Sequence, residues 1–340
     1  MSRRLVRSHN LPALLGLMLA LVSSSALAQY QPIPLVSDIS GNAKYTDTLL
    51  KNPWGLAYGP GAPFWVSDEA SGWSTLYNGM GVKQGLEVVV PPISGSGPGS
   101  PTGIVYNGST EFAIDSWTSV FLFATLDGTI SGWSDFDPST ALIAVSNTGA
   151  SYTGLAITNY TSGNSLFAAD FANNKVDIYD GSFNLVGSFT DPAIPPGFAP
   201  FGIQDIGGQV YVAYAAISGG PGGYIDVFDE NGTFVKHFAH GKPLNQPWGF
   251  ALAPPDFGPL SSSLLITNNV TAGEITGYNL TTGKLVGTMM NTFGKPLTVN
   301  GLWGIEFGGG TAANGLKNQL FFTAGPNDSD GWFGFIVFKK

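Results

Sequence analysis

Six residues stand directly before six regularly spaced glycines, and their side chains are the first candidates for contact with a ligand. They are Trp54, Thr102, Thr153, Phe201, Trp248 and Trp303. Aromatic rings gathered at one mouth of a channel can stack on a sugar or another flat molecule. The alternative is that they fill the wedge-shaped gaps between structural repeats, which large aromatic rings also do well.

A second candidate set consists of oxygen-bearing side chains at the ends of predicted strands. Its members are Asp68, Asp115, Asp170 and Asn268. Oxygen ligands from several repeats can converge on calcium. The alternative is that each side chain binds backbone N–H groups in the turn that follows its own strand. We expect no cofactor, and structural calcium is the metal that this set would suit.

Beyond His9 the chain contains two histidines, His237 and His240, and it has no cysteine. The lack of cysteine excludes disulfides, thiolate nucleophiles and cysteine-ligated zinc. Two histidines at this spacing, with no third ligand beside them in the sequence, are weak evidence for a metal. A Ser-His-Asp triad built on them would lie on an outer strand, away from the centre of the fold. The sequence therefore predicts no tightly bound catalytic transition metal.

The glycines that follow the first set recur with a period of about 50 residues. They are Gly55, Gly103, Gly154, Gly202, Gly249 and Gly304, separated by 48, 51, 48, 47 and 55 residues. Most begin a short apolar segment, and second strands are expected at 64–68, 111–115, 166–170, 210–214, 264–268 and 320–324. Polar turns such as Asn231-Gly232 suit tight hairpins. This period is typical of a six-bladed β-propeller with four-stranded blades.

The last repeat is incomplete, and an unassigned apolar run precedes the first. Residues 335–338 form its third strand, and only Lys339 and Lys340 follow. Residues 33–36 are predicted to supply the missing outer strand and so close the ring. Pro32 and Pro34 suit an outer strand, where a missing N–H need not face a neighbour.

Residues 1–28 are typical of a secretory signal peptide, with early arginines, an apolar stretch and a terminal Ala26-Leu27-Ala28. Its removal leaves residues 29–340 as a single propeller domain. All three arginines lie in this segment, so the remainder has 14 − 3 = 11 lysines against 23 acidic residues, a net charge of −12. Such a surface is unsuited to nucleic acid. We expect a secreted or periplasmic monomer with no membrane span after cleavage.

The repeat resembles that of NHL-type propellers, and the chain is more similar to an uncharacterised family of secreted, mostly bacterial propellers. The resemblance rests on segments such as 52–57, 123–133, 199–204 and 322–328 and extends over residues 33–338. It implies a propeller and an exported location, with no activity attached. Gluconolactonase-like propellers have Glu, Asn and Asp metal ligands near the positions of Trp54 and its equivalents. The aromatic and threonine side chains of this chain argue against that chemistry.

The preferred hypothesis is a non-enzymatic ligand-binding or scaffold protein of the cell envelope or exterior. Its partner would be a small molecule, a glycan or a protein bound at a channel mouth or on the blade-top loops. The alternative is a hydrolase or lyase that acts on a small neutral or cationic substrate. A buried channel carboxylate with a raised pKa would favour the enzyme.

Overall fold

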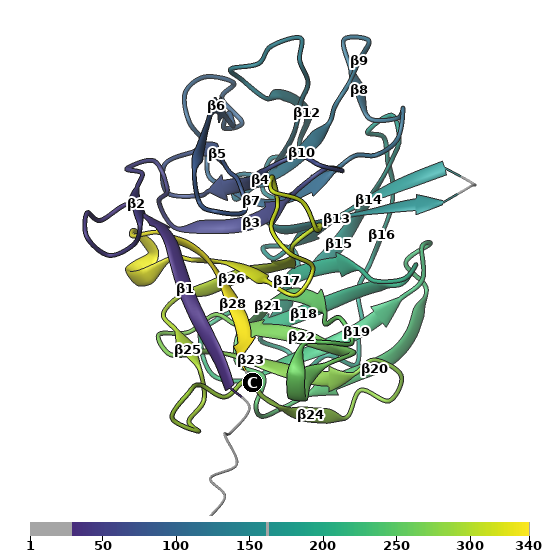
Figure 1. The fold of residues 1–340 in the computed structure, drawn as a ribbon. Helices are drawn as coiled ribbons and strands as arrows, with labels where there is room; N and C mark the ends of the chain where they lie inside the picture. Colours follow the sequence, from purple (N-terminus) through teal and green to yellow (C-terminus); the bar gives the residue numbers. More distant parts are fainter. Residues whose placement is uncertain (1–28, 161–162, 340) are drawn as a thin grey trace, which may run out of the picture.

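The repeats fold into six small antiparallel sheets arranged as the blades of a propeller (Figure 1). The computed structural model describes residues 29–160 and 163–339. In this part of the chain the regular elements are β-strands and two single-turn 3-10 segments, η1 (Gly258–Leu260) and η2 (Pro326–Asp328). None of the described helices has the length and apolar character needed to cross a membrane. The prediction of a six-bladed β-propeller is confirmed; the predicted signal peptide lies outside the described residues.

Each blade has four main strands, which follow one another from the channel outward. Blade 1 consists of β3 (Pro53–Ala57), β4 (Phe64–Asp68), β5 (Trp73–Tyr77) and β6 (Lys83–Val89). Blade 2 consists of β7 (Pro101–Tyr106), β10 (Phe121–Thr125), β11 (Thr129–Trp133) and β12 (Leu142–Ser146). Blade 3 consists of β13 (Tyr152–Tyr160), β14 (Gly163–Asp170), β15 (Lys175–Asp180) and β16 (Leu185–Phe189).

Blades 4 to 6 follow the same order. Blade 4 consists of β17 (Phe198–Asp205), β18 (Val210–Ala216), β19 (Gly223–Phe228) and β20 (Phe234–His240). Blade 5 consists of β21 (Pro247–Leu252), β22 (Ser263–Asn268), β23 (Gly273–Asn279) and β24 (Leu285–Thr288), with β25 (Thr298–Val299) paired to β23. Blade 6 consists of β26 (Leu302–Phe307), β27 (Leu320–Ala324), β28 (Trp332–Lys339) and β1 (Gln29–Ser37), with β2 (Tyr45–Thr46) parallel to β1.

The second strand of blade 2 is β10, and the expectation that residues 111–115 form it is wrong. Leu122 pairs with Val105 of the inner strand. Residues 113–118 instead form a separate hairpin of β8 (Ala113–Ile114) and β9 (Trp117–Thr118). The second strand of a blade is enclosed on both faces, which requires an apolar run. Residues 121–124 of β10 form such a run, and every residue of β10 is buried. In the hairpin Asp115 is exposed, so that segment cannot occupy the same place.

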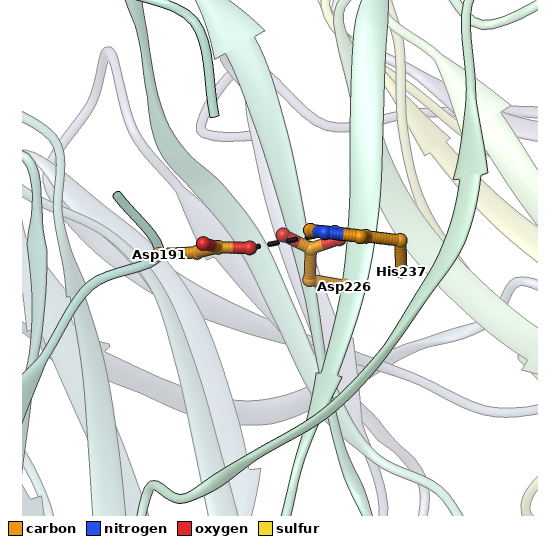
Figure 2. Close-up of side chains that lie close together, drawn as sticks. All are labelled: Asp191, Asp226 and His237. Carbon is orange, nitrogen blue, oxygen red and sulfur yellow. Dashed lines mark hydrogen bonds and ion pairs between the residues drawn. The ribbon is translucent and has the colours of Figure 1, made fainter. Parts of the chain in front are cut away.

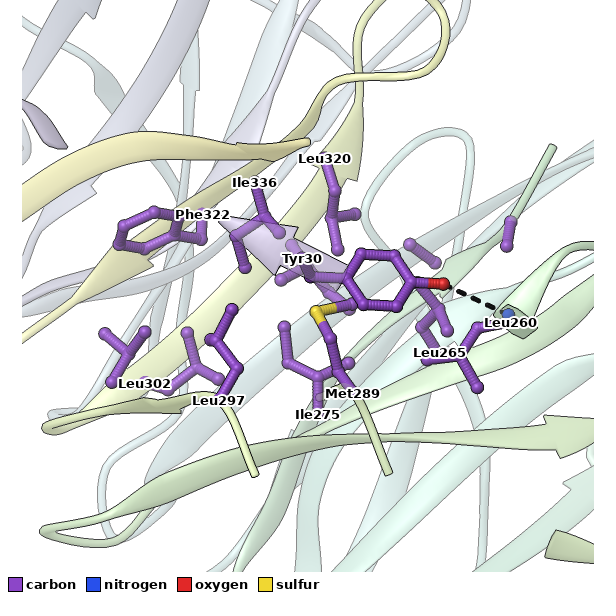
Figure 3. Close-up of a cluster of buried hydrophobic side chains, with 14 of the residues drawn as sticks. Tyr30, Leu260, Leu265, Ile275, Met289, Leu297, Leu302, Leu320, Phe322 and Ile336 are labelled. Carbon is purple, nitrogen blue, oxygen red and sulfur yellow. Dashed lines mark hydrogen bonds between the residues drawn. The ribbon is translucent and has the colours of Figure 1, made fainter. Parts of the chain in front are cut away.

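The N-terminal strand closes the ring as predicted, and it begins earlier than expected. β1 pairs antiparallel with β28 from Gln29 opposite Lys339 to Ser37 opposite Trp332. Figure 3 shows the ring of Tyr30 enclosed by apolar side chains of blades 5 and 6. The Tyr30 hydroxyl donates to the carbonyl oxygen of Phe257 at 2.6 Å and accepts from the N–H of Leu260 at 3.1 Å. β1 therefore joins the first residues of the propeller to both of its last two blades.

The repeat glycine of each inner strand marks a close approach between neighbouring blades. A Cβ on Gly55 would lie 2.6 Å from the carbonyl oxygen of Thr102, which is shorter than real Cβ contacts. A Cβ on Gly202 would overlap the carbonyl oxygen of Trp248. The same kind of contact with the next inner strand occurs at Gly103, Gly154, Gly249 and Gly304. The absence of a side chain at this position is what lets the six inner strands pack around the axis.

We expect Gly202→Ala to lower the free energy of unfolding by at least about 2 kcal/mol, because the added methyl group must push two blades apart. Urea denaturation measures this change. Gly85→Ala is the matched control, since Gly85 also lies in a strand but a Cβ there would have no neighbour within 4 Å. It should be neutral or slightly stabilising. An equal loss in both variants would contradict the close-approach argument.

Candidate functional site

The predicted aromatic set closes one end of the central channel. The tryptophans Trp54, Trp248 and Trp303 are all buried and form one cluster, against which the half-buried Phe201 packs. Trp54 and Trp303 stack with ring centroids 3.7 Å apart, and Trp248 meets Trp303 edge-on at 5.7 Å. Because the rings face one another, no tryptophan presents an open face to solvent. This arrangement favours the packing alternative over a stacking platform.

Four residues of the same set form hydrogen bonds with another blade. The Thr102 hydroxyl donates to the carbonyl oxygen of Tyr152 at 2.6 Å, and Thr153 makes a longer contact of 3.5 Å with Pro200. The indole N–H of Trp248 crosses the channel to the carbonyl oxygen of Thr153 at 2.9 Å. The indole of Trp303 donates to Asn52 at 3.0 Å. Hydrogen bonds therefore hold Trp248 and Trp303, whereas Trp54, whose buried indole N–H has no partner among the described residues, is held by stacking on Trp303.

Past the repeat glycines the inner strands diverge into a funnel. A cavity of about 30 Å³ beside Trp248 leads to one of about 370 Å³, and Gln204 and Glu306 line both. Tyr58, Tyr106 and Asp205 contribute to the wall of the larger cavity. The funnel is therefore open opposite the tryptophan plug, and its polar floor consists of two side chains from blades 4 and 6.

Glu306 is the most perturbed carboxylate of the funnel. Burial among apolar inner strands raises its pKa to about 7. Burial also raises the pKa of Tyr58 to about 12, with a further contribution from the charge of Glu306. A carboxyl group that titrates near neutrality can bind a cation when ionised, donate a hydrogen bond when protonated, or exchange a proton with a substrate.

Sequence reasoning did not select Glu306, although a signal was present. The residue two places after the repeat glycine is Ala57, Val105, Ala156 and Ala251 in four blades. In blades 4 and 6 the same position is Gln204 and Glu306. A polar side chain at a repeat position that is otherwise apolar therefore identifies the residues that form the polar floor.

The predicted calcium ligands lie in separate blades and serve local contacts. Asp170 accepts from the backbone N–H groups of Ser151 and Asn173 at 3.1 and 3.2 Å. Asn268 accepts from the N–H of Asn245 at 2.7 Å. Asp68 is fully buried and accepts from the Thr75 hydroxyl at 2.7 Å, while burial raises its pKa well above its usual range. Asp115 lies in the exposed hairpin described above, so the four side chains do not converge in the structure.

The structure does bring two carboxylates to one of the predicted histidines. His237, on the outer strand β20, has its Nδ1 atom 2.9 Å from Oδ1 of Asp226 and 3.4 Å from Oδ2 of Asp191 (Figure 2). Asp226 lies on β19 directly opposite His237, and Asp191 follows β16 of the preceding blade. His240 stacks on Tyr224 instead, with ring centroids 6.1 Å apart. Asp191 is 46 residues from His237 in sequence, which is why spacing alone did not reveal this group.

The fold and channel define a six-bladed propeller plugged at one end and open at the other. No protein-family model matches the chain. It belongs to the family of Uncharacterized protein R648 of Acanthamoeba polyphaga mimivirus, to which it is 32% identical over 89% of this chain and 78% of that protein. Uncharacterized protein L690 of the same virus is 30% identical over 92% of this chain and 87% of its own.

Solved structures with the same architecture include enzymes of different classes, at identities that show the fold alone. The soluble aldose sugar dehydrogenase of Escherichia coli superposes with a TM-score of 0.57 at 12% identity, over 91% of this chain and all of its own. A streptogramin B lyase gives 0.54 at 13% identity, over 93% of this chain and all of its own. The Xanthomonas campestris gluconolactonase gives 0.54 at 12% identity, over 90% of this chain and 97% of its own.

We expect Trp248→Ala to lower the free energy of unfolding by roughly 3 to 5 kcal/mol, because it empties a large buried site and removes an inter-blade hydrogen bond. Chemical denaturation followed by circular dichroism measures this. Trp117→Ala is the control, since Trp117 lies in the β8/β9 hairpin and is 48% exposed. It should cost less than about 1 kcal/mol. If the two substitutions cost the same, the plug is not structural.

The raised pKa of Glu306 predicts a pH dependence of stability. Between its usual pKa of 4.5 and the folded value of about 7, the unfolded chain has lost this proton while the folded chain keeps it. The free energy of unfolding therefore falls as the pH rises through this window, on the order of 2 kcal/mol in total. Glu306→Gln should show a smaller decline, whereas Asp256→Asn, at an exposed aspartate, should retain the full one, because Asp226, whose pKa burial also raises to about 7, contributes equally in both variants. Unfolding measured from pH 4 to 8 with the same slope in both variants would refute the assignment.

Proposed function

We propose that this protein is an exported binding protein that captures a small polar molecule in the open funnel. The observation that supports this most directly is the polar floor of Gln204 and Glu306 at the base of a cavity of about 370 Å³. That volume suits a molecule of monosaccharide size. The tryptophan plug behind the floor prevents passage through the ring, so the funnel is a site with one entrance.

The charge of the funnel favours a neutral or cationic ligand. Asp205 and Glu306 are its acidic residues, and no lysine lines it within the described part of the chain. Tyr58 and Tyr106 provide aromatic faces at the wall, against which a sugar ring or an alkylammonium group can pack. The net charge of −12 beyond residue 28 adds a long-range attraction for cations.

The location is inferred from residues 1–28, whose arginines, apolar stretch and Ala26-Leu27-Ala28 fit a secretory signal. Release after cleavage would place the propeller in the periplasm or outside the cell, where its lack of cysteine makes it independent of the redox state. The resemblance to secreted bacterial propellers supports the same location. We expect a monomer there, without nucleic acid or an anionic membrane as partner.

An enzyme of the hydrolase or lyase class is the second candidate, and Glu306 is the observation that favours it. A carboxyl group with a pKa of about 7 is suited to general acid–base catalysis near neutral pH. Similarity in fold to a lyase and a gluconolactonase shows that the architecture accommodates such reactions, without assigning one.

The test is a thermal-shift screen of the purified protein against neutral monosaccharides and linear diamines. We expect one of these compounds to raise the melting temperature of the wild type by mass action. The rise for Glu306→Gln should be at least about tenfold smaller at the same compound concentration. Asp256→Asn controls for the loss of one negative charge. Equal stabilisation of all three proteins would place binding outside the funnel.

The same compounds distinguish the two candidates when each is incubated with the protein and the mixture is analysed by mass spectrometry. Binding without a new product supports the binding protein. A new product that forms with wild type and not with Glu306→Gln establishes the enzyme, with Glu306 as its acid–base residue.

A further inference from the structure

A second site stands at the outer part of the groove between blades 3 and 4, outside the funnel. Asp226 and His237 are opposite one another on adjacent strands, and Asp191 approaches them from the loop that leaves blade 3. One ligand atom from each residue lies within 4.8 Å of the others. Figure 2 shows the two carboxylates directed toward the imidazole edge. Among the residues that the structure describes, this is the one group of at least three His, Asp or Glu side chains with this proximity.

The two carboxylates are buried without a lysine, and the imidazole of His237 is the one basic side chain paired with them in the described residues. Among the other buried aspartates, Asp38, Asp47 and Asp177 each pair with a lysine ammonium at 2.5 to 2.8 Å, whereas Asp68 and Asp170 accept local hydrogen bonds instead. Asp191 and Asp226 have no lysine within ion-pair distance in the described ranges. Two buried negative charges side by side are strongly unfavourable unless a positive charge or a proton compensates them.

Several buried oxygen atoms at this place also lack a hydrogen-bond partner. Oδ2 of Asp226 makes no hydrogen bond within residues 29–160 and 163–339, and Oδ2 of Asp191 has only its 3.4 Å contact with His237 Nδ1. The hydroxyl of Tyr214, a fully buried residue on the same face of blade 4, is also unpartnered there. Tyr214 pairs with Tyr224, two residues before Asp226 on β19, so its side chain lies on the same face of the blade as Asp226. Unsatisfied buried oxygens around one point are typical of an ion or water site.

Blade 3 shows what the same repeat position looks like when it is neutralised internally. Asp177 occupies the place in β15 that Asp226 occupies in β19. Lys175, two residues earlier, binds Asp177 at 2.7 Å, and the Tyr152 hydroxyl donates to it at 3.0 Å. In blade 4 the residue at the lysine position is Tyr224. Blade 4 therefore lacks the lysine that blade 3 supplies to its equivalent aspartate.

We propose that Asp191, Asp226 and His237 together bind one divalent first-row transition-metal ion, of the zinc or manganese type. Two carboxylates and one imidazole are a mixed oxygen and nitrogen donor set that suits these ions, whereas calcium prefers six to eight oxygens. Metal–ligand bonds of about 2.0–2.1 Å place neighbouring ligand atoms roughly 2.8 to 3.4 Å apart in octahedral or tetrahedral geometry. The contacts of 2.9 and 3.4 Å from His237 Nδ1 match this spacing.

The surroundings leave room for an exchangeable ligand and for entry of the ion. A cavity of about 330 Å³ adjoins the group, lined by Asp226 and His237 and by Ala193, Ile194, Tyr224, Ala239 and His240. The His237 side chain is 53% exposed, whereas both carboxylates are buried. Three protein ligands with an open side are the arrangement in which water or a small anion completes the coordination.

The experiment is isothermal titration of the chelator-treated protein with ZnCl₂ and, separately, MnCl₂, with CoCl₂ as a spectroscopic probe. We expect one zinc or manganese ion to bind per chain. Bound cobalt should give a visible absorption spectrum that indicates coordination by the imidazole. His237→Gln should weaken binding at least about tenfold, and so should Asp226→Asn. His240→Gln is the matched control, because it changes a histidine three residues away in the same cavity, and it should bind as wild type does.

Circular dichroism on each variant separates loss of the site from loss of the fold. His237 is half exposed, so its substitution is expected to leave the fold intact and to keep the test decisive. Absence of stoichiometric binding by folded wild type overturns the proposal. Equal binding by wild type and His237→Gln overturns it as well, and so does a calcium site that is insensitive to that substitution. These outcomes are independent of the ligand screen on Glu306.

Discussion

The close approach of six inner strands at the repeat glycines is the constraint on which the rest of the structure depends. At Gly55 and Gly154 a Cβ would lie only 2.6 and 3.0 Å from the carbonyl oxygens of Thr102 and Phe201. At this spacing short hydrogen bonds connect one blade to the next inner strand. The Thr267 hydroxyl, for example, donates to the carbonyl oxygen of Trp303 at 2.7 Å. The same hydroxyl accepts from the N–H of Gly249 at 2.8 Å. Glycine therefore sets the diameter of the ring, and hydroxyl groups hold it there.

That narrow end determines where a ligand can enter. The residues before the glycines project into a channel too tight to remain open, so Trp54, Trp248 and Trp303 fill it with their rings. The strands diverge beyond the glycines, and the residues two places further on line a widening funnel. A polar side chain at the narrow end is used for bonds between blades, whereas Glu306 at the start of the wide end is free of such a role. Site and plug are therefore two consequences of the same strand geometry.

The repeat made the architecture predictable, because each blade uses the same pattern for the same contacts. The spacing of the glycines and the unassigned run at 33–36 were sufficient for the blade number and for closure by β1. Prediction failed in blade 2, where an inserted hairpin resembles a strand by composition and only burial distinguishes Asp115 from Thr125. It also missed the group around His237, because Asp191 belongs to the preceding blade. Contacts between blades depend on how the sheets pack, which spacing along one repeat does not describe.

Departures from the repeat, rather than the repeat itself, indicate where chemistry is available. Asp170 and Asn268 recur at strand ends and are saturated by local backbone bonds. Glu306 stands at a position that is apolar in four blades, and burial there raises the pKa of its carboxyl group to about 7. Asp226 stands at a repeat position that four other blades fill with the uncharged Thr75, Ser131, Thr276 and Gly334, and Tyr224 stands where blade 3 has the lysine that pairs with its equivalent aspartate. In both cases a carboxyl group stands at a repeat position that most blades fill with an uncharged residue, and its buried charge needs a proton, an adjacent imidazolium or an external cation to compensate it.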